Sequence, residues 1–216
     1  MESSNQTQVR SATPSYAQII NMMNLVRSEA ELDEIEEALK VDPVISYRLM
    51  TQINSAGMGF PRQVRSIRQA ITIFGYHGLY RWLAMLLVTA DPQDGKSIIG
   101  RMAIIRGRFL ELIGRTPADP RRGDDLFVVG TFSLLDNIFG EPMEKLLNNL
   151  SISYVMRQAL VSRDGPYGLY LLLVEALELG DESQVEGFCS MLDLSRKSVN
   201  ELHASAMGWA DRMLSC

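Results

Sequence analysis

The 216-residue sequence has little of what redox and metal chemistry require. Cysteine occurs only at Cys189 and Cys216, and histidine only at His77 and His203. Neither histidine has a second histidine or a cysteine at the spacing that zinc and iron sites use. Two cysteines in a chain of this length also do not make a disulfide scaffold. We therefore expect free thiols, no metal site and no other cofactor.

Long hydrophobic runs are also missing. The most apolar stretches, residues 82–90 and 169–177, are much shorter than the 18 or more residues of a membrane span. The polar N-terminus has no apolar segment of the kind that a secretory signal contains. We therefore expect a cytoplasmic protein without membrane contact. A content of 46% hydrophobic and 22% charged residues is typical of a globular chain.

Apolar residues three and four positions apart predict helices along nearly the whole chain, and no alternating pattern indicates a strand. Asp42-Pro43 and Ser66 are typical helix starts, whereas Gly75 and Gly180 are typical helix ends. Ser28 with Glu31 predicts a capping box, and Asp124 predicts the start of a later helix. The predicted helices are residues 14–26, 31–40, 43–53, 67–74, 79–89, 98–112, 126–139, 142–150, 153–161, 166–179, 183–192 and 195–214.

The spacing of these helices predicts one all-α domain over residues 13–216. The connections between them are too short to separate independent domains. Residues 1–12 are polar and aperiodic, so we expect them to form a flexible tail.

Several short motifs lie close together between residues 39 and 83. They are Asp42-Pro43, Asn54-Ser55-Ala56, Gly59 before Pro61, Val64 before Ser66-Ile67, Ala70-Ile71, and Gly75 followed by Leu79. This pattern closely resembles the front half of the HDOD family. Residues 123–181 look like the later portion of the HDOD module in bacterial proteins that join it to an EAL domain. The resemblance covers about residues 13–190 and implies an HDOD-like helical fold related to HD domains.

HD phosphohydrolases hold a metal with an adjacent His-Asp pair, and the resembling segment lacks that pair. At the matching place the chain reads Gly130, Thr131, Phe132, Ser133 and Leu134. Serine and leucine cannot replace an imidazole and a carboxylate as metal ligands, and Asp136 stands alone nearby. The resemblance thus implies a degenerate, metal-free HD-type site and a signalling module that performs no catalysis.

The HDOD resemblance also implies possible partners. The EAL domain that acts on cyclic di-GMP in the wider family is not found in this sequence. We therefore expect a regulatory domain that recognises a signalling protein. An EAL or other cyclic di-GMP protein acting in trans is one candidate partner, and a homodimer is left open.

The loop and helix start between Asn54 and Arg68 form the candidate partner-binding surface. A methionine and a phenylalanine in a glycine-rich loop offer an adaptable apolar contact, and nearby arginines form a basic rim. Asn54 and Ser55 have an alternative role as a helix cap and clamp between helices. The candidate residues are Asn54, Ser55, Met58, Phe60, Arg62, Arg65 and Arg68.

Positive charge is concentrated between residues 62 and 122. This segment has eleven Arg and Lys against four Asp and Glu, a net charge of +7, so the rest of the chain carries −12 to reach the total of −5. These arginines either pair with the acidic helix at residues 29–37 or attract an external partner. One alternative function is a residual nucleotide-binding or phosphohydrolase domain in cyclic di-GMP signalling. The other is nucleic-acid binding, which the acidic total charge argues against.

Overall fold

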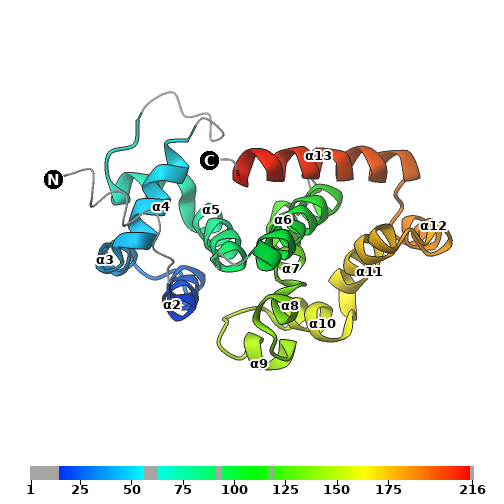
Figure 1. The fold of residues 1–216 in the computed structure, drawn as a ribbon, viewed down its shortest axis with the longest axis horizontal. Coiled ribbons are helices and arrows are strands. Elements are labelled where there is room, and N and C mark those ends of the chain that lie inside the picture. The colour runs from blue at the N-terminus through cyan, green and yellow to red at the C-terminus, as the bar shows by residue number, and fades with distance from the viewer. Residues whose placement is uncertain (1–14, 56–62, 91–93, 117–118, 215–216) are drawn as a thin grey trace. The chain divides into compact units, whose positions relative to one another are not determined.

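The computed structural model describes residues 15–55, 63–90, 94–116 and 119–214, without the side chains of residues 94–97 and 120. Every named element in this part of the chain is a helix (Figure 1), and the only β-type pairing there is an isolated bridge between Thr116 and Asp119. The all-α fold class is confirmed. The chain divides into two compact units, residues 1–93 with 215–216 and residues 94–214. The predicted tail lies outside the described residues, and the single domain over 13–216 stays a prediction.

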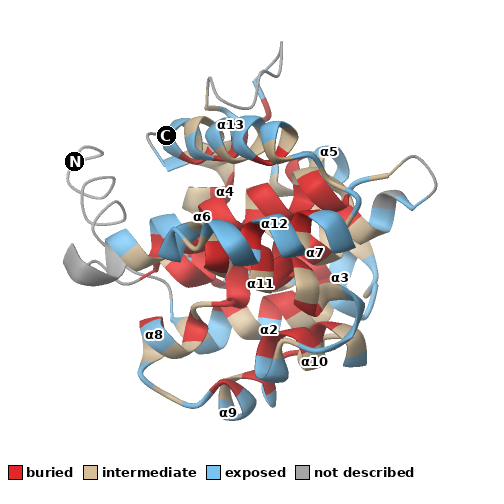
Figure 2. Ribbon diagram, turned by 90° about the vertical axis from the view of Figure 1, so that its right-hand side faces the viewer, coloured by how far each residue is buried: buried red, intermediate tan, exposed pale blue. Residues whose placement is uncertain are grey.

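The first unit contains α2 (Tyr16–Arg27), α3 (Leu32–Val41), α4 (Pro43–Ile53) and α5 (Ile67–Thr89). Helix α5 packs against each of the other three. Burying apolar side chains drives this packing, and the buried faces are red in Figure 2. The side chains at the centre of the unit are Ile19, Met23, Ile35, Leu39, Ile45, Leu49, Ile53 and Leu79.

Two of the predicted helix starts in this unit are confirmed. Asp42 precedes Pro43, and its Oδ1 accepts hydrogen bonds from the backbone N–H groups of Val44 and Ile45, each at 2.9 Å. Ser66 Oγ accepts from the N–H of Gln69 at 3.1 Å. These bonds satisfy N–H groups that have no partner within the helix.

The predicted capping box of Ser28 and Glu31 was wrong. Ser28 instead ends α2, and its hydroxyl donates to the carbonyl oxygen of Leu25 at 2.9 Å. Glu29 adopts a left-handed conformation with φ of 53°, which turns the chain between the two helices. Glu31 then precedes α3 without a side-chain cap, because the serine hydroxyl is bonded to the preceding turn.

The predicted break at Gly75 is present as a kink within α5. Gly75 has φ 64° and ψ 174°, which is far from helical values, and the helix continues on both sides of it. A positive φ of this size is costly for residues with a Cβ, so glycine suits the position. The kink separates the amphipathic start of α5 from its more apolar second part, where Leu79, Trp82 and Leu83 are buried.

The second unit contains α6 (Asp94–Gly114), α7 (Pro120–Phe132), α8 (Leu135–Phe139), α9 (Met143–Leu147), α10 (Tyr154–Ser162), α11 (Gly165–Leu179), α12 (Glu182–Met191) and α13 (Arg196–Leu214). Helix α6 packs against both α7 and α13, and α11 packs against α10 and α12. Gly180 ends α11 with φ 69°, as predicted.

The predicted helix over residues 126–139 had the wrong bounds. Helix α7 begins at Pro120, where Asp119 Oδ1 accepts from the N–H of Arg122 at 3.2 Å. Asp124 therefore lies inside the helix and does not begin it. The helix ends at Phe132, and α8 starts only at Leu135. The cause is the Asp-Pro pair at 119–120, which starts this helix in the way that Asp42-Pro43 starts α4.

Two glycines bring α6 and α7 unusually close together. A Cβ added to Gly130 would lie 2.7 Å from the carbonyl carbon and oxygen of Arg106 and from Cα of Gly107. A Cβ added to Gly107 would lie 2.7 Å from the carbonyl oxygen of Phe127. Real Cβ atoms do not approach this closely, so both positions require glycine. The contact places Arg106 on α6 beside the end of α7.

Among the described helices, Ile67–Thr89 alone is long and apolar enough to meet a composition test for a membrane span. Half of the most apolar 18-residue stretch of this helix is buried inside the protein, as expected of a core helix. Buried helices of globular proteins commonly have this length and composition.

Candidate functional site

Asn54 connects the end of α4 to the start of the segment before α5. Its Nδ2 donates to the carbonyl oxygens of Met50 and Val64, each at 2.9 Å. Its Oδ1 accepts from the N–H of Val64 at 2.8 Å. The amide thus pairs with the backbone of Val64 on both sides, as a neighbouring strand would. This geometry favours the clamp interpretation of Asn54, whose role in partner binding stays a prediction.

Ser55 and Gln52 lie beside this clamp. The Oγ of Ser55 and the Nε2 of Gln52 are shielded from solvent and have no hydrogen-bond partner among the described residues. Three further candidates, Met58, Phe60 and Arg62, lie outside the described residues. The structure therefore places four of the seven predicted residues: Asn54, Ser55, Arg65 and Arg68.

Arg68 pairs with the acidic face of α3. Its Nη2 bonds to Asp33, and its Nε lies 2.6 Å from Glu36 Oε2. Lys40 extends the chain of charges to Glu36 at 3.0 Å and to Glu37 at 2.8 Å. The Arg68 guanidinium lowers the pKa of Asp33, and chiefly Lys40 lowers that of Glu36. For Arg68, the predicted pairing with the acidic helix is confirmed.

Arg65 differs from Arg68. It is exposed, and its backbone N–H donates to Gln69 Oε1 at 3.1 Å. Its guanidinium has no ionic partner among the described residues. An exposed cation beside the Asn54 clamp is available to an acidic group of another molecule.

The basic band continues into α6, where partners within the second unit neutralise several arginines. Arg101 bonds to Asp211 Oδ1 through Nε at 2.9 Å and Nη2 at 2.6 Å. Arg108 Nη1 donates to Glu111 Oε2 at 2.7 Å, and the Arg108 guanidinium lies 5.1 Å from the ring centre of Trp209. The excess of +7 counted along the chain is therefore partly neutralised by ion pairs within the chain.

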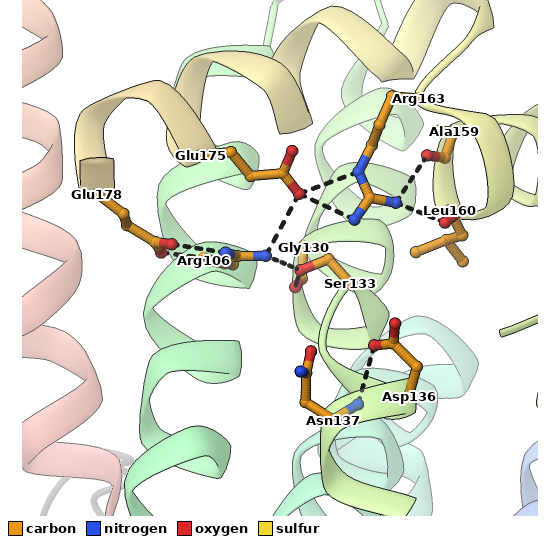
Figure 3. A network of polar contacts seen from close by, with 10 residues as sticks. All are labelled: Arg106, Gly130, Ser133, Asp136, Asn137, Ala159, Leu160, Arg163, Glu175 and Glu178. Carbon is orange, nitrogen blue, oxygen red and sulfur yellow. Dashed lines mark hydrogen bonds and ion pairs between the residues drawn. The ribbon is translucent and has the colours of Figure 1, made fainter. Parts of the chain in front are cut away.

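Ser133 stands where the resemblance calls for the histidine of a His-Asp pair, and a buried arginine, Arg106, bonds to it (Figure 3). Ser133 is 2% exposed, and its Oγ accepts from Arg106 Nη1 at 2.9 Å and donates to the carbonyl oxygen of Gly130 at 2.7 Å. The other edge of the Arg106 guanidinium bonds to both oxygens of Glu178, at 2.9 and 2.5 Å. Glu175 Oε1 lies 3.7 Å from Nη1.

A second arginine extends this network to α10. Arg163 bonds to Glu175 Oε1 through Nε at 3.0 Å and Nη2 at 2.9 Å. Its Nη1 donates to the carbonyl oxygens of Ala159 and Leu160 in the last turn of α10. Its own backbone is left-handed, with φ 60°, a costly conformation for a residue with a Cβ. We call Arg106, Ser133, Arg163, Glu175 and Glu178 the arginine junction.

Asp136, the remaining acidic candidate near the missing pair, bonds locally. Its Oδ1 accepts from the N–H of Asn137 at 2.9 Å in the first turn of α8. Across the described residues no group of three or more His, Cys, Asp or Glu side chains is arranged to hold a metal ion.

Sequence reasoning missed the arginine junction. The available signal was Arg106, which lies four positions after Met102 and next to Ile105 in the apolar series of residues 98–112. A second signal was a pair of glutamates three positions apart in the apolar helix 166–179. Charged residues at such positions are rarely buried unless they are paired.

Residues 11–99 match the family model of the HDOD domain. The HDOD resemblance is confirmed. The chain is 23% identical over 203 residues to the uncharacterized protein YuxH of Bacillus subtilis, an alignment that covers 93% of this chain and 48% of the relative. It is 24% identical over 182 residues to the cyclic di-GMP phosphodiesterase CdgJ of Vibrio cholerae, covering 84% of this chain and 42% of the relative.

The chain therefore spans less than half the length of these two curated relatives. The match to the HDOD family model ends at residue 99, within α6. The alignment with YuxH covers 93% of the chain and therefore includes most of both units. No solved structure gives a significant match.

Proposed function

We propose that this chain is a non-catalytic regulatory domain that acts by protein–protein recognition in bacterial cyclic di-GMP signalling. The HDOD match and the similarity to a cyclic di-GMP phosphodiesterase support the signalling context. The observation that carries the non-catalytic part is at Ser133, where the resemblance expects a metal-binding histidine. A buried serine there bonds to Arg106, and a guanidinium is not a metal ligand.

The recognition surface is the segment from Asn54 to Arg68. The Asn54 clamp attaches the segment after α4 to the backbone at Val64, next to the start of α5. Arg65 supplies an exposed cation, whereas Arg68 is already shared between Asp33 and Glu36. Of these two arginines, Arg65 is therefore the one that contacts an acidic patch of the partner.

The experiment is affinity capture with this chain as bait, comparing Arg65→Glu with a matched control, Arg121→Glu. Both arginines are exposed and lie in the same basic band, but Arg121 is in the other unit. We expect Arg65→Glu to reduce capture of the partner at least about tenfold, which corresponds to about 1.4 kcal/mol. Arg121→Glu should leave capture unchanged, and circular dichroism should show equal helix content in both variants.

Equal capture by both variants would show that the surface is elsewhere. The non-catalytic part has its own test, calorimetry with cyclic di-GMP and hydrolysis assays with Mg²⁺ and Mn²⁺. Saturable nucleotide binding or turnover would replace the proposal with the nucleotide-binding alternative. Retention on heparin that is lost steeply with salt would instead favour nucleic acid. Size-exclusion chromatography decides whether a second copy is the partner.

A further inference from the structure

The arginine junction connects four helices through one buried cation and its acceptors (Figure 3). Arg106 comes from α6, Ser133 follows α7, Glu175 and Glu178 belong to α11, and Arg163 caps α10. The Arg106 side chain is 7% exposed, against 27% for Glu175 and 25% for Glu178. Nearly all of the water around this guanidinium has therefore been replaced by protein acceptors.

The acceptors are arranged around a planar fork. Glu178 meets one edge of the guanidinium with both carboxylate oxygens, through Nε and Nη2. Ser133 Oγ and Glu175 meet the opposite nitrogen, Nη1. A guanidinium offers five N–H donors in a rigid plane, which a lysine ammonium cannot reproduce. The acceptor positions thus select a guanidinium by shape as well as by charge.

Charge within the junction is balanced. Two arginines face two glutamates, and Glu175 lies between Arg106 and Arg163. Removing Arg106 would leave Glu178 without its guanidinium partner, because Arg163 bonds to Glu175. An unpaired charge in a poorly hydrated site is strongly destabilising.

We propose that the arginine junction is a binding site for one guanidinium group, filled from within the chain by Arg106, and that a divalent metal ion cannot take its place. Mg²⁺ prefers six oxygen ligands in an octahedron, several of them waters. The junction instead surrounds a side chain that is only 7% exposed, so it has little room for the several waters that Mg²⁺ keeps. This inference concerns the second unit and does not depend on the proposed partner.

Chemical rescue of Arg106→Ala tests the proposal. Trp209 reports on the second unit once the other tryptophan is removed by Trp82→Phe. In that background we expect Arg106→Ala to lower the melting temperature by about 10 °C. Methylguanidinium at ten times its dissociation constant should then restore about 4 °C. Mg²⁺ and Mn²⁺ at the same concentration should restore nothing.

The matched control is Arg101→Ala. Arg101 lies on α6, as Arg106 does, and the substitution removes its solvent-exposed ion pair with Asp211 of α13. Methylguanidinium should not raise the melting temperature of this variant or of the unsubstituted chain. Absence of rescue in Arg106→Ala, an equal rise in Arg101→Ala, or rescue by Mg²⁺ would each overturn the proposal.

A second variant keeps the test decisive if Arg106→Ala does not fold. Arg106→Lys keeps the positive charge but loses the planar set of N–H donors. It therefore separates the effect of the charge from the effect of the guanidinium shape. We expect its melting temperature to lie about 5 °C below that of the unsubstituted chain. A value equal to that of the unsubstituted chain would show that any cation suffices, and the guanidinium-specific site would be refuted.

Discussion

Replacing Asn54 separates a structural clamp from a partner contact. Asn54→Ala removes three hydrogen bonds, two of them to the backbone of Val64. Val64 is 2% exposed, so water cannot easily replace the lost partners of its N–H and carbonyl groups. A hydrogen bond contributes about 1 kcal/mol net, and an unsatisfied buried group costs about 1–3 kcal/mol. We therefore expect the first unit to lose about 3 kcal/mol of unfolding free energy.

Urea denaturation followed by tryptophan fluorescence measures this loss. Trp82 is 4% exposed in α5 and reports on the first unit when the second unit carries Trp209→Phe. Asn54→Asp keeps the acceptor for the N–H of Val64 but loses both donated bonds, so its loss should be intermediate. Gln63→Ala, an exposed substitution next to Val64, is the control and should be near neutral.

A change of less than about 0.5 kcal/mol in Asn54→Ala would refute the clamp reasoning, because surface substitutions fall in that range. The same variant then becomes informative about binding. If it keeps its stability but loses partner capture, the amide contacts the partner directly, and the hydrogen bonds to Val64 are dispensable.

Three further predictions concern the second unit. Burial lowers the pKa of His203 below its ordinary value of 6.5, and its ring packs edge-on against Phe109 with 5.3 Å between the ring centres. As the pH falls through 6.5, the histidine of the unfolded chain therefore takes up a proton before that of the folded chain, which favours unfolding. The melting temperature should fall from pH 7 to pH 5, and His203→Phe should flatten this profile. Burial, together with Asp125, raises the pKa of Tyr167 to about 12. The free energy of unfolding, measured by urea denaturation, should therefore decline between pH 10 and 12. If the decline is absent in Tyr167→Phe, the ionisation of Tyr167 is its cause. Gly130→Ala should cost about 3 kcal/mol because its Cβ would collide with Arg106, whereas a Cβ on Gly187 meets nothing within 4 Å and Gly187→Ala should be neutral or stabilising in thermal melts.

Local signals predicted much of the first unit. The Asp42-Pro43 start, the Ser66 cap and the break at Gly75 each depend on residues within a few positions of one another. Asp119-Pro120 carries the same signal as Asp42-Pro43, but it lies in a segment rich in proline, glycine and arginine that resembles a loop. The sequence pattern therefore indicates a helix start at Asp124. Composition outweighed the more specific capping signal, and this shifted the start of α7.

Charge pairing was predictable only where the acidic residues formed an obvious group. The cluster from Glu29 to Glu37 pointed to a partner for nearby arginines, and Arg68 does pair with Asp33 and Glu36. In contrast, Arg106 pairs with Glu178, a residue 72 positions away. Helical periodicity assigns each residue to a face of its own helix, but it carries no information on which faces meet.

The missing His-Asp pair illustrates what sequence can and cannot reveal about a site. Ser133 and Leu134 show that two metal ligands are absent, which is a statement about residue types alone. The cation that occupies this region comes from Arg106, and it can reach Ser133 only because Gly107 and Gly130 let α6 and α7 approach so closely. A substitution that separates these helices would remove the cation from its acceptors without changing any charged residue. Gly130→Ala and Arg106→Ala should therefore be non-additive in a double-mutant cycle, because both disrupt the same contact. Full additivity of the two losses would show that the close approach and the guanidinium site are independent features.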